Sequence, residues 1–133
     1  MAPFRGTFDH TLDAKNRLTV PARYRSLLAE GVVLATPVDL LPCVGVWRAG
    51  DYEEYTRQAL ENQPAVSARR AELARFLYGG SHDVDLDAAG RIMIPVSLRE
   101  TAGLTKDVKV VGAGERLELW DAASWSEHHQ VLQ

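Results

Sequence analysis

The sequence predicts an α+β, β-rich protein made of two tandem ββαββ repeats, with helices between and after them. The first observation behind this prediction is an internal duplication, because LDAKNRLTVP at 12–21 returns as LDAAGRIMIP at 86–95. The second is the β-branched alternation of short segments such as RLTVP, which is typical of strands. The third is a helical stretch of different pattern between the copies. The expected divisions are repeat 1 at 5–50, a helical connector at 51–78, repeat 2 at 79–122 and a C-terminal helix at 123–133.

The duplication extends well beyond these ten residues. The segment 4–25 aligns with 78–99 at a constant offset of 74 positions. Farther along the spacing drifts by a residue or two, and VGVWRAGDYEEY at 44–55 resembles LELWDAASWSEH at 117–128. Half of a chain of 133 residues would be only marginally stable alone, because small domains bury a smaller fraction of their surface. We therefore expect the two copies to share one core.

Each copy opens with a strand that leads into a β-hairpin turn. The stretches AKNR and AAGR place Asn16 and Gly90 at the same position, and these two residue types best tolerate a left-handed backbone. Asp13 and Asp87 begin the turns, where a carboxylate can accept hydrogen bonds from turn amides. The segments RLTVP and RIMIP are then expected to form the second strands of the two hairpins.

A short helix follows each hairpin. Pro21 and Pro95 suit the first helical turn, and Gly31 and Gly103 suit the helix ends. Each helix leads into an apolar segment, VVLATPV or DVKVVGA, and then through a second turn region into VGVW or LELW. Both copies therefore predict the order ββαββ.

The connector predicts two amphipathic helices. In the first, one face carries Tyr52, Tyr55 and Ala59. After the break at Asn62-Gln63-Pro64, the apolar stripe of the second consists of Val66, Leu73, Phe76 and Leu77. We interpret these faces as packing surface in preference to a ligand box. The helical pair is a candidate for contact with a neighbouring subunit.

Charge and cysteine content narrow the function classes. The net charge is −3, but residues 1–25 carry five basic and two acidic side chains, so a basic patch lies on an acidic body. Such a patch is typical of an anion-binding surface or of an ordinary solvated face.

Cys43 is the only cysteine, which predicts no intramolecular disulfide and a reducing cytoplasm. No segment reaches the ~18 apolar residues of a spanning helix, so no membrane association is expected.

No arrangement of residues points to catalysis or to a bound cofactor. None of the four histidines belongs to a His-Glu-x-x-His motif, and the adjacent His128 and His129 diverge by about 100° on a helix, which favours surface imidazoles. The run GAGER at 112–116 begins like a dinucleotide loop, but Leu117 stands at the third glycine position. We expect no enzyme, no cofactor and no metal.

The Asp-x-x-x-Arg hairpins are the candidate functional sites. One interpretation is structural, in which each aspartate caps its turn and pairs with its arginine, as exposed ion pairs do at little gain in stability. The other is binding of double-stranded DNA, because arginines on a β-hairpin can enter a major groove and bind guanine O6 and N7 bidentately. Lysine beside them suits the phosphates. The candidate DNA-binding residues are Asp13, Lys15, Arg17, Arg23, Arg25, Asp87 and Arg91.

These motifs resemble the MraZ family of bacterial transcriptional regulators. The resemblance lies in FRGTFDHTLDAKNRLTVPARYR, ARFLYGGSHDVDLDAAGRIMIP and AGLTKDVKVVGAGERLELWD, and it covers nearly the whole chain. It implies a pseudo-two-fold swapped-hairpin β-barrel of AbrB-like halves within one chain. It also implies a nucleoid-associated, ring-shaped homo-oligomer that binds short direct repeats in the promoter of its own operon, a division and cell-wall gene cluster. The family's signature residues fall on Asp13, Arg17, Asp87 and Arg91.

The two hairpins are unequal in charge. Lys15 and Arg23 correspond to Ala89 and Ser97, so we expect the first hairpin to supply most of the DNA affinity. The second would orient the barrel or add one arginine. The alternative function is an oligomeric protein-interaction scaffold without specific DNA readout. The salt dependence of DNA binding separates the two, because phosphate contacts make affinity fall steeply as salt rises.

Overall fold

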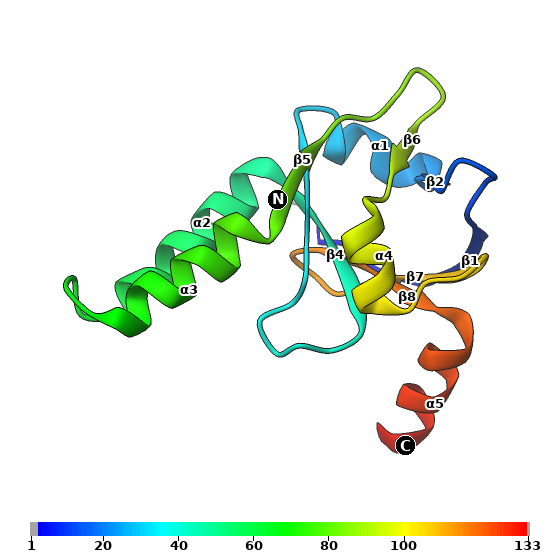
Figure 1. The fold of residues 1–133 in the computed structure, drawn as a ribbon. Helices are drawn as coiled ribbons and strands as arrows, with labels where there is room; N and C mark the ends of the chain where they lie inside the picture. Colours follow the sequence, from blue (N-terminus) through cyan, green and yellow to red (C-terminus); the bar gives the residue numbers. More distant parts are fainter. Residues whose placement is uncertain (1–2, 133) are drawn as a thin grey trace.

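The fold consists of two repeats in the predicted order, as seen in a computed structural model that describes residues 3–132 (Figure 1). Repeat 1 comprises β1 (Thr7–Thr11), β2 (Arg17–Thr19), α1 (Ala22–Leu28), β3 (Val32–Ala35) and β4 (Cys43–Arg48). Repeat 2 comprises β5 (Ser81–Val84), β6 (Arg91–Met93), α4 (Val96–Ala102), β7 (Asp107–Gly112) and β8 (Leu117–Asp121). Between and after them lie α2 (Ala49–Glu61), α3 (Ala68–Gly79) and α5 (Ala122–Leu132). The chain is an α+β protein of two ββαββ units, and Gln133 of the expected C-terminal helix lies outside the described residues.

Strand pairing is exchanged between the repeats. All strands pair antiparallel, in a six-stranded sheet of order β1-β7-β8-β4-β3-β5 and a separate ladder of β2 with β6. The first strand of each repeat therefore lies against a strand of the other repeat: β1 on β7, and β5 on β3. This corrects the expectation of locally paired hairpins. The turns form, but the strands on either side of each turn diverge, because pairing across the repeats is what covers the common core.

One apolar core serves both repeats, as predicted. The short ladder closes it on one side, where Leu18 and Ile92 face each other and are 1% and 0% exposed. Buried side chains of both repeats join the same cluster, among them Phe4, Leu34, Val44, Val110 and Leu119. In residues 3–132 the main cluster draws on both repeats, and a smaller one packs Val33, Ala35 and Trp47 of repeat 1 against Tyr52 of α2. Each repeat therefore depends on the other for its main core.

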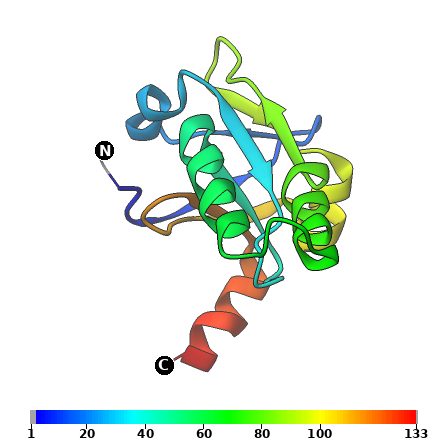
Figure 2. The ribbon, with the colours of Figure 1, turned by 90° about the vertical axis from the view of Figure 1, so that its left-hand side faces the viewer.

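The helices α2 and α3 form a pair that projects from the sheet (Figures 1 and 2). The inner end of α2 packs on the sheet through Tyr52, which contacts Trp47 of β4, and the Tyr52 hydroxyl donates to the Leu77 carbonyl at 2.6 Å. The prediction that Val66 belongs to the apolar stripe of the second connector helix is wrong. Ser67 caps α3 by accepting the Arg70 N–H at 3.0 Å, so Val66 precedes the helix and is 96% exposed.

The helix ends follow the expected chemistry in only one repeat. Gly103 terminates α4 in the left-handed conformation, with φ of 65°. By contrast α1 ends at Leu28, before Gly31 is reached. No helix within residues 3–132 has the length and apolar character needed to cross a bilayer.

Candidate nucleic-acid interface

The two Asp-x-x-x-Arg turns have the same backbone geometry. Asn16 and Gly90 adopt the left-handed conformation that their residue types predict, with φ of 60° and 77°. In each turn the N–H of this residue donates to the carbonyl of the aspartate three positions earlier, at 2.9 Å. Local sequence therefore determines the turn itself.

The aspartate carboxylate holds each turn and its arginine together. Asp13 Oδ1 accepts the backbone N–H groups of Lys15 and Arg17 at 2.9 Å, and Asp13 Oδ2 accepts from Arg17 Nε at 2.8 Å. Asp87 and Arg91 repeat this arrangement, with the same Nε–Oδ2 distance of 2.8 Å. The arginine backbone N–H is the main cause that lowers the pKa of each aspartate, and the bond from the arginine side chain adds to it. Part of the structural interpretation of these residues is thus correct.

This pairing uses only one of the three guanidinium nitrogens. The bond to Nε fixes the plane of the guanidinium of Arg17 and of Arg91, whose side chains are 25% and 33% exposed. The two terminal nitrogens of each arginine have no hydrogen-bond partner in the described part of the chain. Each turn therefore holds a preorientated fork of donors that is available to a partner.

The β2–β6 ladder brings both arginines to one surface. Arg17 lies opposite Met93, and Thr19 lies opposite Arg91. Because alternate residues of a strand point to opposite faces, these four side chains share the outer face above the buried middle pair. Met93 is 55% exposed there. Sequence reasoning missed Thr19 and Met93, although their alternation with the buried positions was a signal for them.

Arg25 lies beside the turn of the other repeat. Its Nε donates to the Val20 carbonyl at 3.0 Å, and a Cβ added to Gly90 would come within 2.4 Å of the same nitrogen. Glycine at position 90 therefore allows the left-handed backbone and also leaves room for the Arg25 side chain. The basic residues assigned to the first hairpin are divided between the turns, since Lys15 remains exposed in the first turn.

Of two other basic residues, one packs on aromatic rings and the other lies beside the first turn. The Arg23 guanidinium lies over the rings of Phe8 and Tyr24, 5.8 and 5.5 Å from their centroids, while the residue remains exposed. Lys106 of repeat 2 lies next to the first turn, because its carbonyl accepts the N–H of Leu12 at 2.9 Å. Lys106 was not among the predicted residues, since only strand exchange brings it there.

We expect Asp13→Asn to reduce the dependence of stability on acidic pH. A carboxyl whose folded-state pKa is lowered stabilises the protein above its ordinary pKa near 3.8, and this contribution disappears as pH falls through the lowered value. The difference in urea midpoint between pH 7 and pH 3 should therefore be smaller in the variant. Asp85→Asn, at an exposed aspartate near the other turn, is the control and should behave as the parent. An unchanged difference in Asp13→Asn would contradict the capping role.

The groups that could have suggested catalysis are occupied in packing. Cys43 is buried, and desolvation raises the pKa of its thiol, which disfavours the reactive thiolate. His128 stacks on Trp120 with ring centroids 4.7 Å apart, so it is half-buried and not the surface imidazole that we expected. Neither group is placed as a nucleophile or base.

The fold and the doubled turn agree with comparisons to known proteins. The family model described as "MraZ protein, putative antitoxin-like" matches residues 3–74 and again 77–133. The chain is 38% identical over 125 residues to the transcriptional regulator MraZ of Micrococcus luteus, covering 94% of this chain and 85% of that protein. It is 39% identical over 127 residues to the MraZ regulator of Kocuria rhizophila, with 96% and 87% covered. This chain therefore belongs to the MraZ family of transcriptional regulators, which are not enzymes.

Proposed function

We propose that this protein regulates transcription by sequence-specific binding of double-stranded DNA through the outer face of the β2–β6 ladder. One observation supports this proposal above all. The Nε atoms of Arg17 and Arg91 donate to aspartates, while their terminal nitrogens have no partner in residues 3–132. A major groove admits a two-stranded β-ribbon, and a guanidinium fork matches guanine O6 and N7. The relatives of this chain are transcriptional regulators, which supports this proposal.

The exchanged strand pairing supports a swapped-hairpin barrel of AbrB-like halves. In this proposal the units at 5–50 and 79–122 each supply one DNA-binding turn, and the connector at 51–78 and the helix at 123–133 lie outside the barrel. Interlocking backbone bonds support a fixed spacing of the two turns: Val20 N–H donates to the Gly90 carbonyl at 2.9 Å, and Ile94 N–H to that of Asn16 at 3.1 Å.

The first turn is proposed to supply most of the affinity. Lys15 and the neighbouring Lys106 surround it with cations, and lysines bind phosphates without reading sequence. Arg25 reduces the expected difference in charge between the two turns, because it lies beside Gly90 of the second turn. The first turn would thus combine an arginine reader with phosphate contacts, and the second would add an arginine reader beside Arg25.

Ring assembly and direct repeats belong to the same proposal. A lone two-fold dimer reads palindromes, whereas identical subunits around a ring present the same reader at regular spacing. Each short contact would be weak, but linked contacts gain through effective concentration. Adjacent basic turns would also offset the net charge of −3. The proposed target is the promoter of the protein's own operon of division and cell-wall genes, in the cytoplasm at the nucleoid.

Footprinting of the purified protein on DNA upstream of its own gene tests this function. Protected short direct repeats at regular spacing are expected, together with an affinity that falls steeply as salt rises. A protected palindrome would contradict the ring. Negligible affinity at low salt, without any slope, would overturn DNA regulation in favour of the scaffold function.

A further inference from the structure

Trp47 and Trp120 occupy equivalent positions in the two repeats, but their indole N–H groups differ in what they meet. In repeat 2, Trp120 Nε1 donates to Glu118 Oε1 at 3.0 Å. Gly45 stands at the equivalent place in repeat 1, two residues before Trp47, and it lies opposite Glu118 across β4 and β8. Since glycine offers no carboxylate, Trp47 Nε1 has no acceptor in the described part of the chain.

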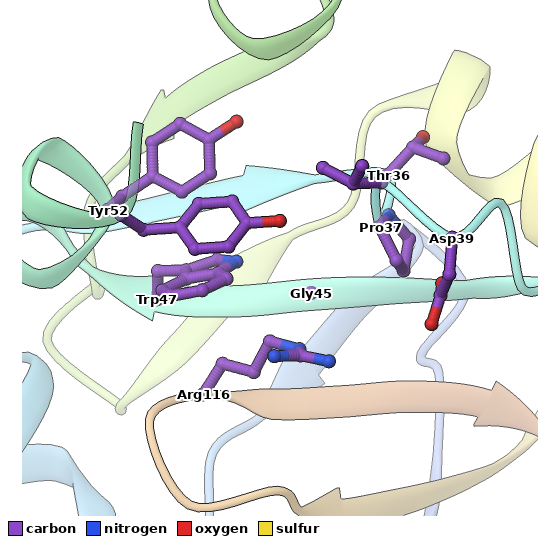
Figure 3. Close-up of a pocket in the computed structure, with 9 residues that line it drawn as sticks. Thr36, Pro37, Asp39, Gly45, Trp47, Tyr52 and Arg116 are labelled. Carbon is purple, nitrogen blue, oxygen red and sulfur yellow. The ribbon is translucent and has the colours of Figure 1, made fainter. Parts of the chain in front are cut away.

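A cavity of about 260 Å³ adjoins this unsatisfied donor (Figure 3). In Figure 3 Trp47 and Tyr52 face the segment of Thr36, Pro37 and Asp39, with the backbone of Gly45 between them. The cavity, here named the Trp47 pocket, has among its lining residues Pro37, Val38, Asp39, Trp47, Tyr55 and Arg116. Drug-sized ligands occupy about 300–1,000 Å³, so this pocket suits a smaller molecule. No fully buried side-chain nitrogen or oxygen in residues 3–132 lacks a partner, so the Trp47 N–H is accessible from the pocket.

The ring faces of Trp47 are engaged by its neighbours. The Arg116 guanidinium lies 5.4 Å from the centroid of the indole, and the Tyr55 ring centroid lies 4.6 Å away. Figure 3 shows Tyr52 and Arg116 on opposite sides of the indole plane. A ligand in the pocket therefore meets the edge of Trp47, where the N–H and the positive rim of the ring favour a hydrogen-bond acceptor.

Charge in the pocket selects a neutral ligand over an anion. Arg116 is already paired, with its terminal nitrogens 2.9 Å from Glu118 Oε2 and 3.4 Å from Glu115 Oε1. Asp39 adds a carboxylate to the lining, of which Oδ1 accepts the Leu41 N–H at 3.2 Å and Oδ2 has no partner within residues 3–132. Together with Glu115 and Glu118, which pair with Arg116, Asp39 gives the surroundings of the pocket more negative than positive charge. A phosphate or carboxylate is therefore disfavoured, whereas an N–H donor finds an acceptor.

We propose that the Trp47 pocket binds a small neutral heterocyclic amide of the nucleobase type, with its carbonyl accepting the Trp47 N–H and an N–H of the ligand donating to Asp39. Pro37 and Val38 supply the apolar wall against which the heterocycle packs. Burial raises the pKa of Tyr55, which keeps its hydroxyl a donor at the same site. This site is separate from the ladder and does not depend on DNA binding.

The indole N–H signals in a ¹⁵N-correlated NMR titration with uridine and guanosine test this directly. The Trp47 indole signal, assigned with Trp47→Phe, should move and saturate with a Kd on the order of 1 mM or tighter. The Trp120 indole signal should not move, because the Trp120 N–H already donates to Glu118. Uridine monophosphate should bind more weakly than uridine. No saturable movement of the Trp47 signal, movement of other signals alone, or equal binding of the nucleotide would overturn the proposal.

Substitutions in the pocket and beside it test which residues bind the ligand. Asp39→Ala removes the acceptor from an exposed loop and should weaken nucleoside binding at least fivefold. Glu115→Ala is the matched control, because Glu115 pairs with Arg116 but does not line the pocket, and it should leave binding unchanged. Gly45→Ala should abolish binding, since its Cβ would lie 2.9 Å from Trp47 Nε1. Should Gly45→Ala not fold, Tyr55→Phe takes its place and should weaken binding while the Trp47 signal remains. Unchanged binding in Asp39→Ala would contradict the assigned acceptor.

Discussion

Arg17→Ala is expected to lower the affinity for operator DNA by about 5- to 140-fold. The loss follows from the 1–3 kcal/mol that a good bidentate arginine–guanine contact contributes to discrimination, with each 1.4 kcal/mol equal to a factor of ten. The arginine is held by Asp13 through Nε at 2.8 Å, so its terminal nitrogens are already positioned and alanine removes an ordered reader. Gel-shift titration at fixed salt measures the change. Light scattering on the same samples verifies that the assembly is intact.

A charge-matched control distinguishes readout from simple loss of a cation. Arg75→Ala removes an exposed arginine on α3 that pairs with Glu72, on the helical pair that projects away from the ladder (Figure 1). The DNA affinity of this variant should remain within about twofold of the parent, because α3 lies away from the ladder and loss of an exposed ion pair costs little stability. Equal losses in Arg75→Ala and Arg17→Ala would show a general electrostatic effect. A larger loss in Arg91→Ala than in Arg17→Ala would reverse the assignment of the first turn as the stronger one.

Ile92→Ala is expected to lower the free energy of unfolding by about 2–5 kcal/mol. Ile92 is 0% exposed, and it meets Leu18 where the β2–β6 ladder closes the core. Truncation leaves a cavity between the two repeats, because the close-packed side chains around it relax only partly. Urea unfolding at one protein concentration measures the change, since any self-association contributes to apparent stability.

Met93→Ala supplies the comparison within the same strand. Met93 follows Ile92 directly but is 55% exposed on the outer face, so its truncation should change stability by less than about 0.5 kcal/mol. Its effect should instead be seen in DNA binding, because an exposed apolar side chain beside Arg17 can contact a thymine methyl group. An equal loss of stability in the two variants would contradict the burial pattern of the ladder.

Features governed by near neighbours in the chain were predictable. The duplicated motif predicted two ββαββ units, because strand alternation and proline at helix starts act over a few residues. Asn16 and Gly90 predicted left-handed turns, since only such residue types accept that backbone at low cost. Asp13 and Asp87 could be placed as turn caps, because a carboxylate there can accept hydrogen bonds from turn amides. The residues alone left open the choice between a structural turn and a DNA-binding one, and the family resemblance favours the DNA-binding role that we propose.

Features that depend on contacts between the repeats needed the tertiary structure. Either repeat could have paired its own strands by local rules, and the observed exchange comes with a common core in which Leu18 faces Ile92. That exchange places Lys106 beside the first turn and Arg25 beside Gly90, which no spacing in the sequence indicates.

The sequence by itself therefore determined the repeat, the turns and the residues that hold them, because their energies arise within a few residues. The tertiary structure alone decided which strands pair, which cations flank each turn and where the chain leaves an open pocket. Trp47 and Trp120 illustrate the physical reason. Their local sequences are related, but whether each indole N–H finds an acceptor depends on the side chain packed against it, a carboxylate at Glu118 and none at Gly45.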